Sequence, residues 1–173
     1  DGNQLVAKIK GVSDNFLDQG RFSKGSFWGD TTLGSPGRPG AILGRGVGFL
    51  LSINLEEINS VVRVFYPKAP RSAATLDPNQ LYTSAFIEPR AFFSIEQQFD
   101  NEYVIAPLSF VRDLLNYGEK RTALEIKVQE GFSIESVQDR IKNLLGPDFT
   151  VKTADEQHAG LIRTVKLEKL FVF

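Results

Sequence analysis

The pattern of apolar residues changes near Gly118, and this change constrains the fold of the 173-residue chain more than any other feature. Before Gly118, short apolar segments alternate with loops rich in Gly, Ser and Pro, which is typical of β-rich structure. After it, two strand-like segments flank a helical pattern. We therefore predict an α+β fold with two lobes, residues 1–118 and residues 119–173. The first lobe is β-rich, although its opening strand is also able to join the second.

The second lobe is predicted to contain a β-α-β unit. Residues 122–128 alternate apolar and polar side chains, and residues 149–153 form a second short strand. Ser133 is suited to cap the helix between them, and Gly146 with the following proline ends it. The apolar positions of this helix fall on one face; they are Ile134, Val137, Ile141, Leu144 and Leu145. Two strands cannot close a sheet, so either the opening strand of the chain or a segment outside this sequence must complete it.

The elements of the first lobe follow from local patterns and from proline. Pro89 lies inside a strand pattern, which predicts a bulge or an edge position. Three prolines in residues 67–79 exclude a regular element there, because proline lacks an N–H and fixes φ. We predict strands at residues 5–11, 41–44, 60–66, 82–96 and 103–106, helices at 45–52 and 107–117, and loops at 13–40 and 67–79.

The last part of the chain resembles the start of a longer helix. Thr153 and Glu156 have the spacing of a capping box. The sequence after them grows more apolar and stops at Phe173 without a C-cap. A membrane span needs about 20 apolar residues, so the end would be only its beginning. We interpret it as the approach to a membrane helix; the alternative is a helix docked on the domain's own core.

The composition argues against several classes of function. The formal net charge is −1 with both signs interspersed, which disfavours binding to a nucleic-acid backbone. No cysteine is present, so disulfides, thiolate zinc sites and cysteine nucleophiles are excluded. His158 is the only histidine and is predicted to be an exposed helical residue, which leaves no base for a catalytic triad. We expect no enzyme activity and no cofactor, which also disfavours a small secreted enzyme.

Two further groups of residues have alternative interpretations. Gly44, Gly46 and Gly48 resemble a dinucleotide fingerprint only superficially, because the third glycine comes one residue early. Small residues for close helix packing explain them better. Arg63, Arg71 and Arg90 form either a small basic patch for a partner or ordinary solvated positions.

Six motifs follow one another along the chain. They are residues 9–12 with Lys-Gly-Val at their end, 41–53, 62–67 ending in proline, 103–115, 123–128, and 165–169 with Leu-Glu-Lys at their end. In this order they resemble the extracytoplasmic domain of lipoprotein-releasing, Lol-type ABC transporter permeases, which are related to macrolide exporters and FtsX-like permeases. The nearest alternative is a related permease, either a tripartite exporter subunit or an FtsX-like regulator of cell-wall hydrolases.

The resemblance implies an architecture and a set of partners. Family members have a membrane-proximal lobe, called Porter, into which a β-rich lobe, called Sabre, is inserted. This chain would hold the Sabre-like lobe and the second half of the Porter-like lobe, on the periplasmic side of the inner membrane. Its partners would be a cytoplasmic ATPase subunit, a second permease subunit, the lipoprotein substrate and a periplasmic lipoprotein carrier.

The resemblance also points to a candidate binding site in the loop at residues 67–80. In one branch of the family, a protruding hairpin called the hook lies at this place and engages the carrier. Prolines would stiffen such a loop and lower the entropy cost of docking. The alternative is a surface loop without a partner. The candidate contact residues are the charged Lys68 and Arg71, the apolar Leu76 and Leu81, and Pro78.

Overall fold

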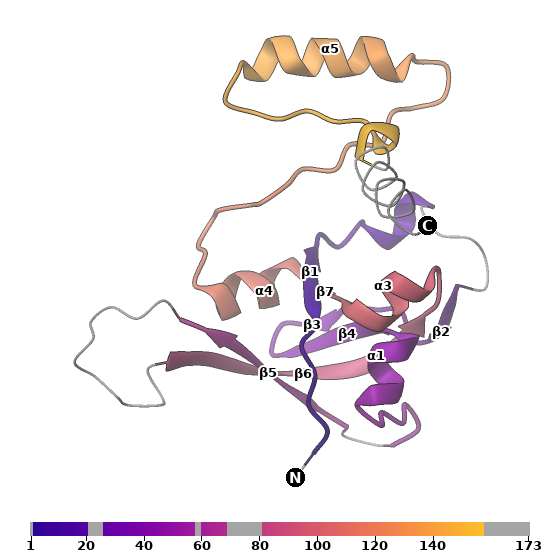
Figure 1. Ribbon diagram of the computed structural model, residues 1–173, viewed down its shortest axis with the longest axis vertical. Coiled ribbons are helices and arrows are strands. Elements are labelled where there is room, and N and C mark those ends of the chain that lie inside the picture. The colour runs from indigo at the N-terminus through magenta and orange to yellow at the C-terminus, as the bar shows by residue number, and fades with distance from the viewer. Residues whose placement is uncertain (1, 21–25, 58–59, 69–80, 158–173) are drawn as a thin grey trace, which may run out of the picture. The chain divides into compact units, whose positions relative to one another are not determined.

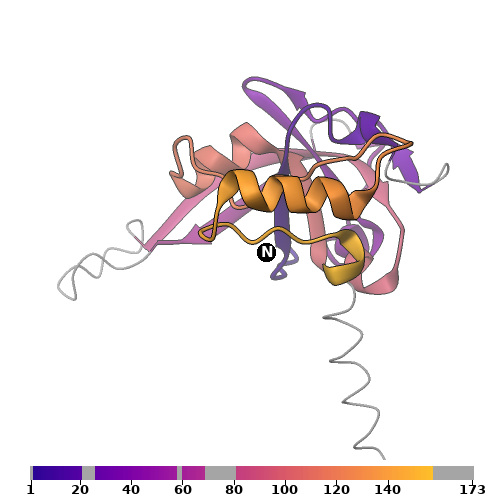
Figure 2. The same ribbon diagram turned by 90° about the horizontal axis from the view of Figure 1, so that it is seen from above.

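The computed structural model describes residues 2–20, 26–57, 60–68 and 81–157, which Figures 1 and 2 show from two directions. The chain divides into two compact units, Asp1–Ala123 and Leu124–Phe173, called here the first and the second unit. The first unit contains a seven-stranded mixed sheet with helices, so the predicted α+β class is confirmed. Within the described ranges, no helix is both long and apolar enough to cross a membrane.

The sheet has the strand order β1-β7-β4-β6-β2, with β3 paired to β4 and β5 paired to β6. The pairs β1/β7 and β4/β6 are parallel, and the other pairs are antiparallel. The strands are β1 (Lys8–Val12), β2 (Phe27–Gly29), β3 (Gly34–Ser35), β4 (Arg38–Gly44), β5 (Val62–Pro67), β6 (Tyr82–Phe93) and β7 (Tyr103–Pro107).

The helices of the first unit are η1 (Leu17–Gln19), α1 (Arg45–Leu50), α3 (Gln97–Glu102) and α4 (Leu108–Leu115). Helix α1 contacts α3 and β4, and α4 packs on β1 and β7. The predicted helices at residues 45–52 and 107–117 are therefore confirmed, each slightly shorter. The predicted loop at residues 13–40 is partly wrong, because β2, β3 and the start of β4 form there.

Alternation along the central strands divides the core into two clusters, one on each face of the sheet. On β4, Ala41 and Leu43 belong to the first cluster and Ile42 to the second. On β7, Ala106 and Ile105 divide in the same way. Burying one such side chain contributes about 1.5–3 kcal/mol, so these two strands supply much of the stability of the first unit.

The predicted irregularity at Pro89 is confirmed as a β-bulge in β6. The parallel register with β4 pairs Ala41 with Pro89 and then Ile42 with Ala91, which leaves Arg90 as the extra residue. On the other edge of β6, pairing with β5 ends at Ile87 and pairing with β2 starts at Ala91. Pro89 therefore removes no ladder hydrogen bond on that side, which explains how a proline fits into a 12-residue strand.

The side chain of the bulged residue Arg90 lies in an ion-pair network. Its Nη1 lies 3.2 Å from Asp30 Oδ2, and its Nη2 lies 3.1 Å from Glu88 Oε2. Arg38 Nε also donates to Glu88, at 2.7 Å. This bond and those from Arg90 lower the pKa of Glu88. The pKa of Asp30 is lowered chiefly by hydrogen bonds from Thr32. The network joins β4, β6 and the loop after β2.

The network predicts how stability depends on pH. Because the folded pKa of Glu88 lies below its ordinary value of 4.5, its carboxylate stabilises the fold above that value. This contribution is lost as the pH falls through the folded pKa. Glu88→Gln should therefore be less stable than the wild type near neutral pH, and the gap should close between about pH 5 and pH 2.

Urea denaturation across that pH range measures the gap. Glu57→Gln is the control, because the exposed Glu57 side chain makes no hydrogen bond within the described ranges. Its difference from the wild type should stay constant. A gap for Glu88→Gln that is equally independent of pH would contradict the prediction.

Three glycines in and before α1 allow a close approach of α3 and β6. A Cβ atom would collide with the Asp100 backbone at Gly44, with the Asn101 side chain at Gly46, and with a neighbouring aromatic ring at Gly48. The interpretation of these glycines as small residues for tight packing is confirmed, and it accounts for them without a bound dinucleotide.

Gly44→Ala should destabilise the protein by about 1–3 kcal/mol, because the new methyl group meets backbone that cannot turn away. Gly2→Ala should change stability by less than about 0.5 kcal/mol, since no atom lies within 4 Å of its Cβ position. Chemical denaturation followed by circular dichroism measures both. Equal midpoints for the two variants would show that α3 does not need this approach.

The second unit contains α5 (Ile134–Leu145), which begins as predicted at Ser133 and ends at Gly146. The Ser133 hydroxyl accepts from the Ser136 amide at 3.2 Å. The predicted capping box is also confirmed: the Thr153 amide donates to Glu156 at 2.8 Å, and the Glu156 amide donates to Thr153 Oγ1 at 3.2 Å. Residues 154–157 are helical, and the predicted continuation with His158 lies outside the described residues.

The two strands predicted for the second lobe are wrong. Residues 122–128 and 149–153 form no ladder, so the β-α-β unit is an extended segment, a helix and another extended segment. The opening strand does not complete the unit, because β1 is paired with β7 in the first unit. A strand needs a neighbour for its backbone groups, and the described chain offers none here. Instead, Gln138 of α5 donates to the Val151 carbonyl at 3.1 Å.

Candidate functional site

The candidate binding loop connects the two strands of an antiparallel hairpin. β5 and β6 pair from Val62 opposite Ile87 to Pro67 opposite Tyr82. One further hydrogen bond, from the Lys68 amide to the Leu81 carbonyl at 2.7 Å, closes the end of the ladder. Figure 1 shows this hairpin projecting from the sheet. We call it the β5–β6 hairpin.

The structure places only two of the five predicted contact residues. Lys68 and Leu81 lie opposite each other at the base of the connection, and both are exposed. Arg71, Leu76 and Pro78 lie outside the described residues, so their role stays a prediction.

One face of the β5–β6 hairpin, called here the outer face, exposes aromatic side chains. The guanidinium of Arg63 lies 4.9 Å from the Phe65 ring centroid and 5.6 Å from that of Phe86. It also donates to Ser84 Oγ at 3.1 Å. The rings of Phe65 and Tyr82 meet edge to face, with centroids 6.5 Å apart. Each of the three aromatic side chains is about half exposed, at 55%, 50% and 59% for Phe65, Tyr82 and Phe86.

Sequence reasoning named Arg63 but missed the aromatic residues around it. Alternation within each strand puts Phe65 on the face of Arg63, and only the register across the hairpin brings Phe86 opposite Arg63. Of the three arginines in the possible basic patch, Arg90 is engaged by carboxylates of the network, and Arg71 lies outside the described residues.

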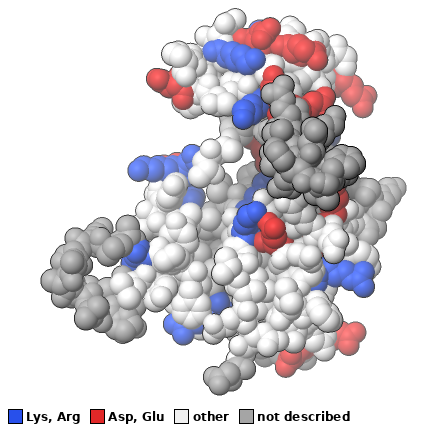
Figure 3. Space-filling model, in the orientation of Figure 1, with Lys and Arg blue, Asp and Glu red and all other residues white. Residues whose placement is uncertain are grey.

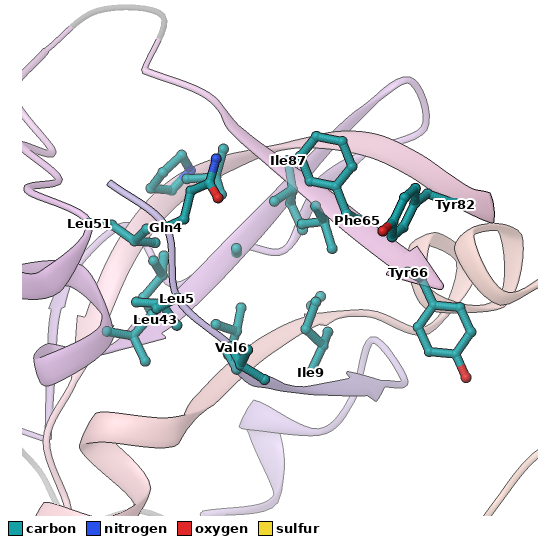
Figure 4. A pocket seen from close by; sticks show the side chains of 18 of the residues that line it. Gln4, Leu5, Val6, Ile9, Leu43, Leu51, Phe65, Tyr66, Tyr82 and Ile87 are labelled. Atoms are coloured by element: carbon teal, nitrogen blue, oxygen red, sulfur yellow. The ribbon is translucent and has the colours of Figure 1, made fainter. Parts of the chain in front are cut away.

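The opposite face of the hairpin borders an apolar groove of about 790 Å³, whose lining also includes Phe65, Pro67 and Tyr82. Figure 4 shows Val6 and Ile9 on one side of it and Phe65 and Tyr82 on the other. The floor is formed by the first core cluster on β4 and β7, and α1 contributes Val47. Gln4, Tyr66 and Tyr82 are the polar residues of the lining, and none of the lining residues is charged. The groove is thus suited to apolar, uncharged groups.

Charged side chains are sparse on much of the first unit. The face seen in Figure 3 is largely uncharged, with isolated basic and acidic side chains. In the described part of the chain, no three His, Cys, Asp or Glu residues gather in a way that would hold a metal ion.

The second unit exposes apolar side chains of its own. Those of α5 and its flanking segments are Leu124, Ile126, Phe132, Ile134, Leu144, Leu145 and Phe149. Leu124 and Leu144 are each 83% exposed. Exposed apolar side chains that lie together on a surface often mark an interaction site, whereas scattered single ones do not.

Comparison with known proteins adds no family assignment. No family model matches the sequence, and no curated protein matches it significantly.

The two faces of the hairpin should respond differently to mutation. Ile87→Ala should cost about 2–5 kcal/mol of stability, because Ile87 is only 3% exposed in the first core cluster. Phe86→Ala, one residue away and exposed, should cost less than about 1 kcal/mol. Thermal or urea unfolding of the two variants measures the difference. Similar losses would mean that the assignment of faces is wrong.

Proposed function

We propose that this chain is the periplasmic domain of an ABC transporter permease that extracts lipoproteins from the inner membrane and passes them to a periplasmic carrier. In this proposal the first unit is the Sabre-like lobe, the second unit is part of the Porter-like lobe, and the β5–β6 hairpin docks the carrier. The observation that supports it most is the projecting hairpin, whose outer face exposes three aromatic rings and an arginine.

The composition of the outer face is that of a protein-binding surface. Aromatic residues and arginine are enriched among the residues that contribute most to binding free energy. Phe65, Tyr82 and Phe86 are not part of either core cluster, so stability alone does not account for them. The Arg63 guanidinium packs against the rings of Phe65 and Phe86, and side chains that are already packed together lose less entropy on docking.

The charges of the proposed docking surface favour a partner with acidic residues. Arg63 and the exposed Lys68 lie on the same hairpin, and no carboxylate within the described ranges contacts Arg63. A partner with an acidic rim would therefore approach faster and in a defined orientation. The chemistry of this surface fits a protein partner and not a nucleic acid, because two basic groups beside three rings make too small a charge for phosphate-backbone binding.

The second unit has a separate role in the proposal. Its two extended segments lack strand neighbours, and its apolar side chains are exposed. Both features fit half of a lobe whose other strands come from elsewhere in a permease. The cytoplasmic ATPase would perform the only chemistry, and a second permease subunit would complete the transporter.

The experiment is a pull-down of the lipoprotein carrier encoded by the same genome. Deleting residues 71–79 should abolish capture, and Arg63→Ala with Phe86→Ala should weaken it at least tenfold, as expected for central contact residues. Arg121→Ala is the matched control, since it removes a charge whose partners among the described residues are Glu119, at 3.4 Å, and the Lys120 carbonyl, at 2.8 Å. It should bind the carrier like the wild type.

Circular dichroism and unfolding midpoints establish that the variants are folded. If the deletion variant is folded and binds the carrier with unchanged affinity, the hairpin is not the docking element. If a periplasmic adaptor of an exporter is captured in place of the carrier, the chain belongs to a related permease and the lipoprotein proposal is wrong.

A further inference from the structure

The free edge of β5 is a feature that the transport proposal does not use. β5 pairs with β6 on one side, and no other strand of the described chain pairs with it. Outside that ladder, the backbone of β5 makes no hydrogen bond among the described residues. Unpaired N–H and C=O groups on a strand edge are a template for another strand.

The register shows which groups of β5 point to the free edge. Lys68 donates to Leu81, so residues of even number on β5 bond to β6, and Arg63, Phe65 and Pro67 point away from it. Pro67 therefore lacks an N–H only where no ladder needs one. The free edge offers the amides of Arg63 and Phe65 and three carbonyls, in a row about 13 Å long at about 3.3 Å per residue.

This edge borders the apolar groove. Val62, Val64 and Tyr66 of β5 line the groove, and the wall across it is formed by residues Leu5, Val6 and Ile9. Figure 4 shows the space between Tyr66 on one side and Ile9 on the other. A strand added to β5 would place every second side chain on the groove side.

We propose that β5 and the groove bind an extended peptide segment of a partner protein by strand addition. The inward side chains of that segment are aliphatic, because no charged residue lines the groove. In antiparallel addition, an outward residue lies directly opposite Arg63, which has no carboxylate partner among the described residues and so favours a glutamate or aspartate there. The ligand is thus a segment of about six residues with alternating aliphatic and polar positions, one of them acidic.

This inference shares Arg63, Phe65 and Tyr82 with the carrier-docking face, but it depends on the free edge of β5 and does not rest on the proposed transport function. It also excludes the connection between the strands, so a protein lacking residues 71–79 should still bind the peptide. Failure of either proposal is therefore distinguishable from failure of the other.

The test uses the 173-residue chain and the synthetic hexapeptide acetyl-Thr-Val-Glu-Val-Thr-Val-amide. Binding is measured by calorimetry and by NMR amide exchange. The Arg63 and Phe65 amides should exchange more slowly with bound peptide, and the Val64 amide, which bonds to β6, should not change. Methylating the amide nitrogen of the glutamate removes a donor aimed at β5, and should weaken binding about tenfold.

Two matched controls separate strand addition from apolar contact. Methylating the amide nitrogen of the central valine leaves the side chains unchanged, and blocks only an amide that points to solvent, so binding should be retained. In the protein, Val64→Thr places a hydroxyl in the groove wall and should weaken binding about tenfold. Val61→Thr changes an exposed valine that does not line the groove, and should have no effect.

Several results would overturn the proposal. One is no binding at millimolar peptide by a protein whose unfolding midpoint is normal. Another is equal binding of both methylated peptides, which would show that no backbone pairing occurs. Binding of laurate in the groove without binding of the peptide would assign the site to a hydrocarbon chain. Dimerisation of the chain through β5 would assign the edge to a second copy.

Discussion

The bulge at Arg90 is the constraint on which the first unit and its hairpin depend. In a regular strand, residues two apart share a face, so Ile87 and Ala91 would point to the same side. They belong to different core clusters here, because the extra residue shifts the alternation between them. The inward and outward positions of β6 are therefore exchanged at the bulge. Before it, the odd-numbered Ile87 points to the first cluster, and after it, the odd-numbered Ala91 points to the second.

The phase shift decides what the hairpin presents. With the bulge, Ile87 and Ala85 of β6 lie on the side of the first cluster, together with Val62 and Val64 of β5. Their neighbours then face outward, including Phe86. A regular strand would exchange the two sets and turn the Phe86 ring toward the groove. The side chain of Arg90 stabilises the irregular backbone by joining Asp30 and Glu88, and Gly40 leaves room for it.

Local patterns were sufficient for the elements whose partners lie nearby in the fold. The apolar run at residues 41–44 and the cap at Ser133 each predicted an observed element, and Pro89 predicted the bulge. The same reasoning failed at residues 122–128 and 149–153. Alternating side chains show only that a segment is suited to be a strand, whereas a ladder requires a second segment with free backbone groups.

The candidate site could not be predicted from local patterns either, because it depends on which strands pair and in what register. The ring of Phe86 and the guanidinium of Arg63 are 23 positions apart in the sequence, and no pattern within one strand brings them together. The free edge of β5 is likewise a property of the sheet, since it follows from which strands are neighbours. Sequence reasoning identified the connection between the strands because its length and prolines are local features.

The two units differ in how far their extended segments find a neighbour for their backbone N–H and C=O groups. In the first unit, β5 pairs with β6 on one side only, and its free edge lies beside an apolar groove. In the second unit, α5 is capped at both ends and Gln138 binds one flanking segment, yet Leu124 and Ile126 stay exposed in the alternating order of a half-buried strand. The hydrogen bond from Gln138 to the Val151 carbonyl holds the segment after α5 to the helix. The free edge of β5 therefore favours association with a short peptide by strand pairing.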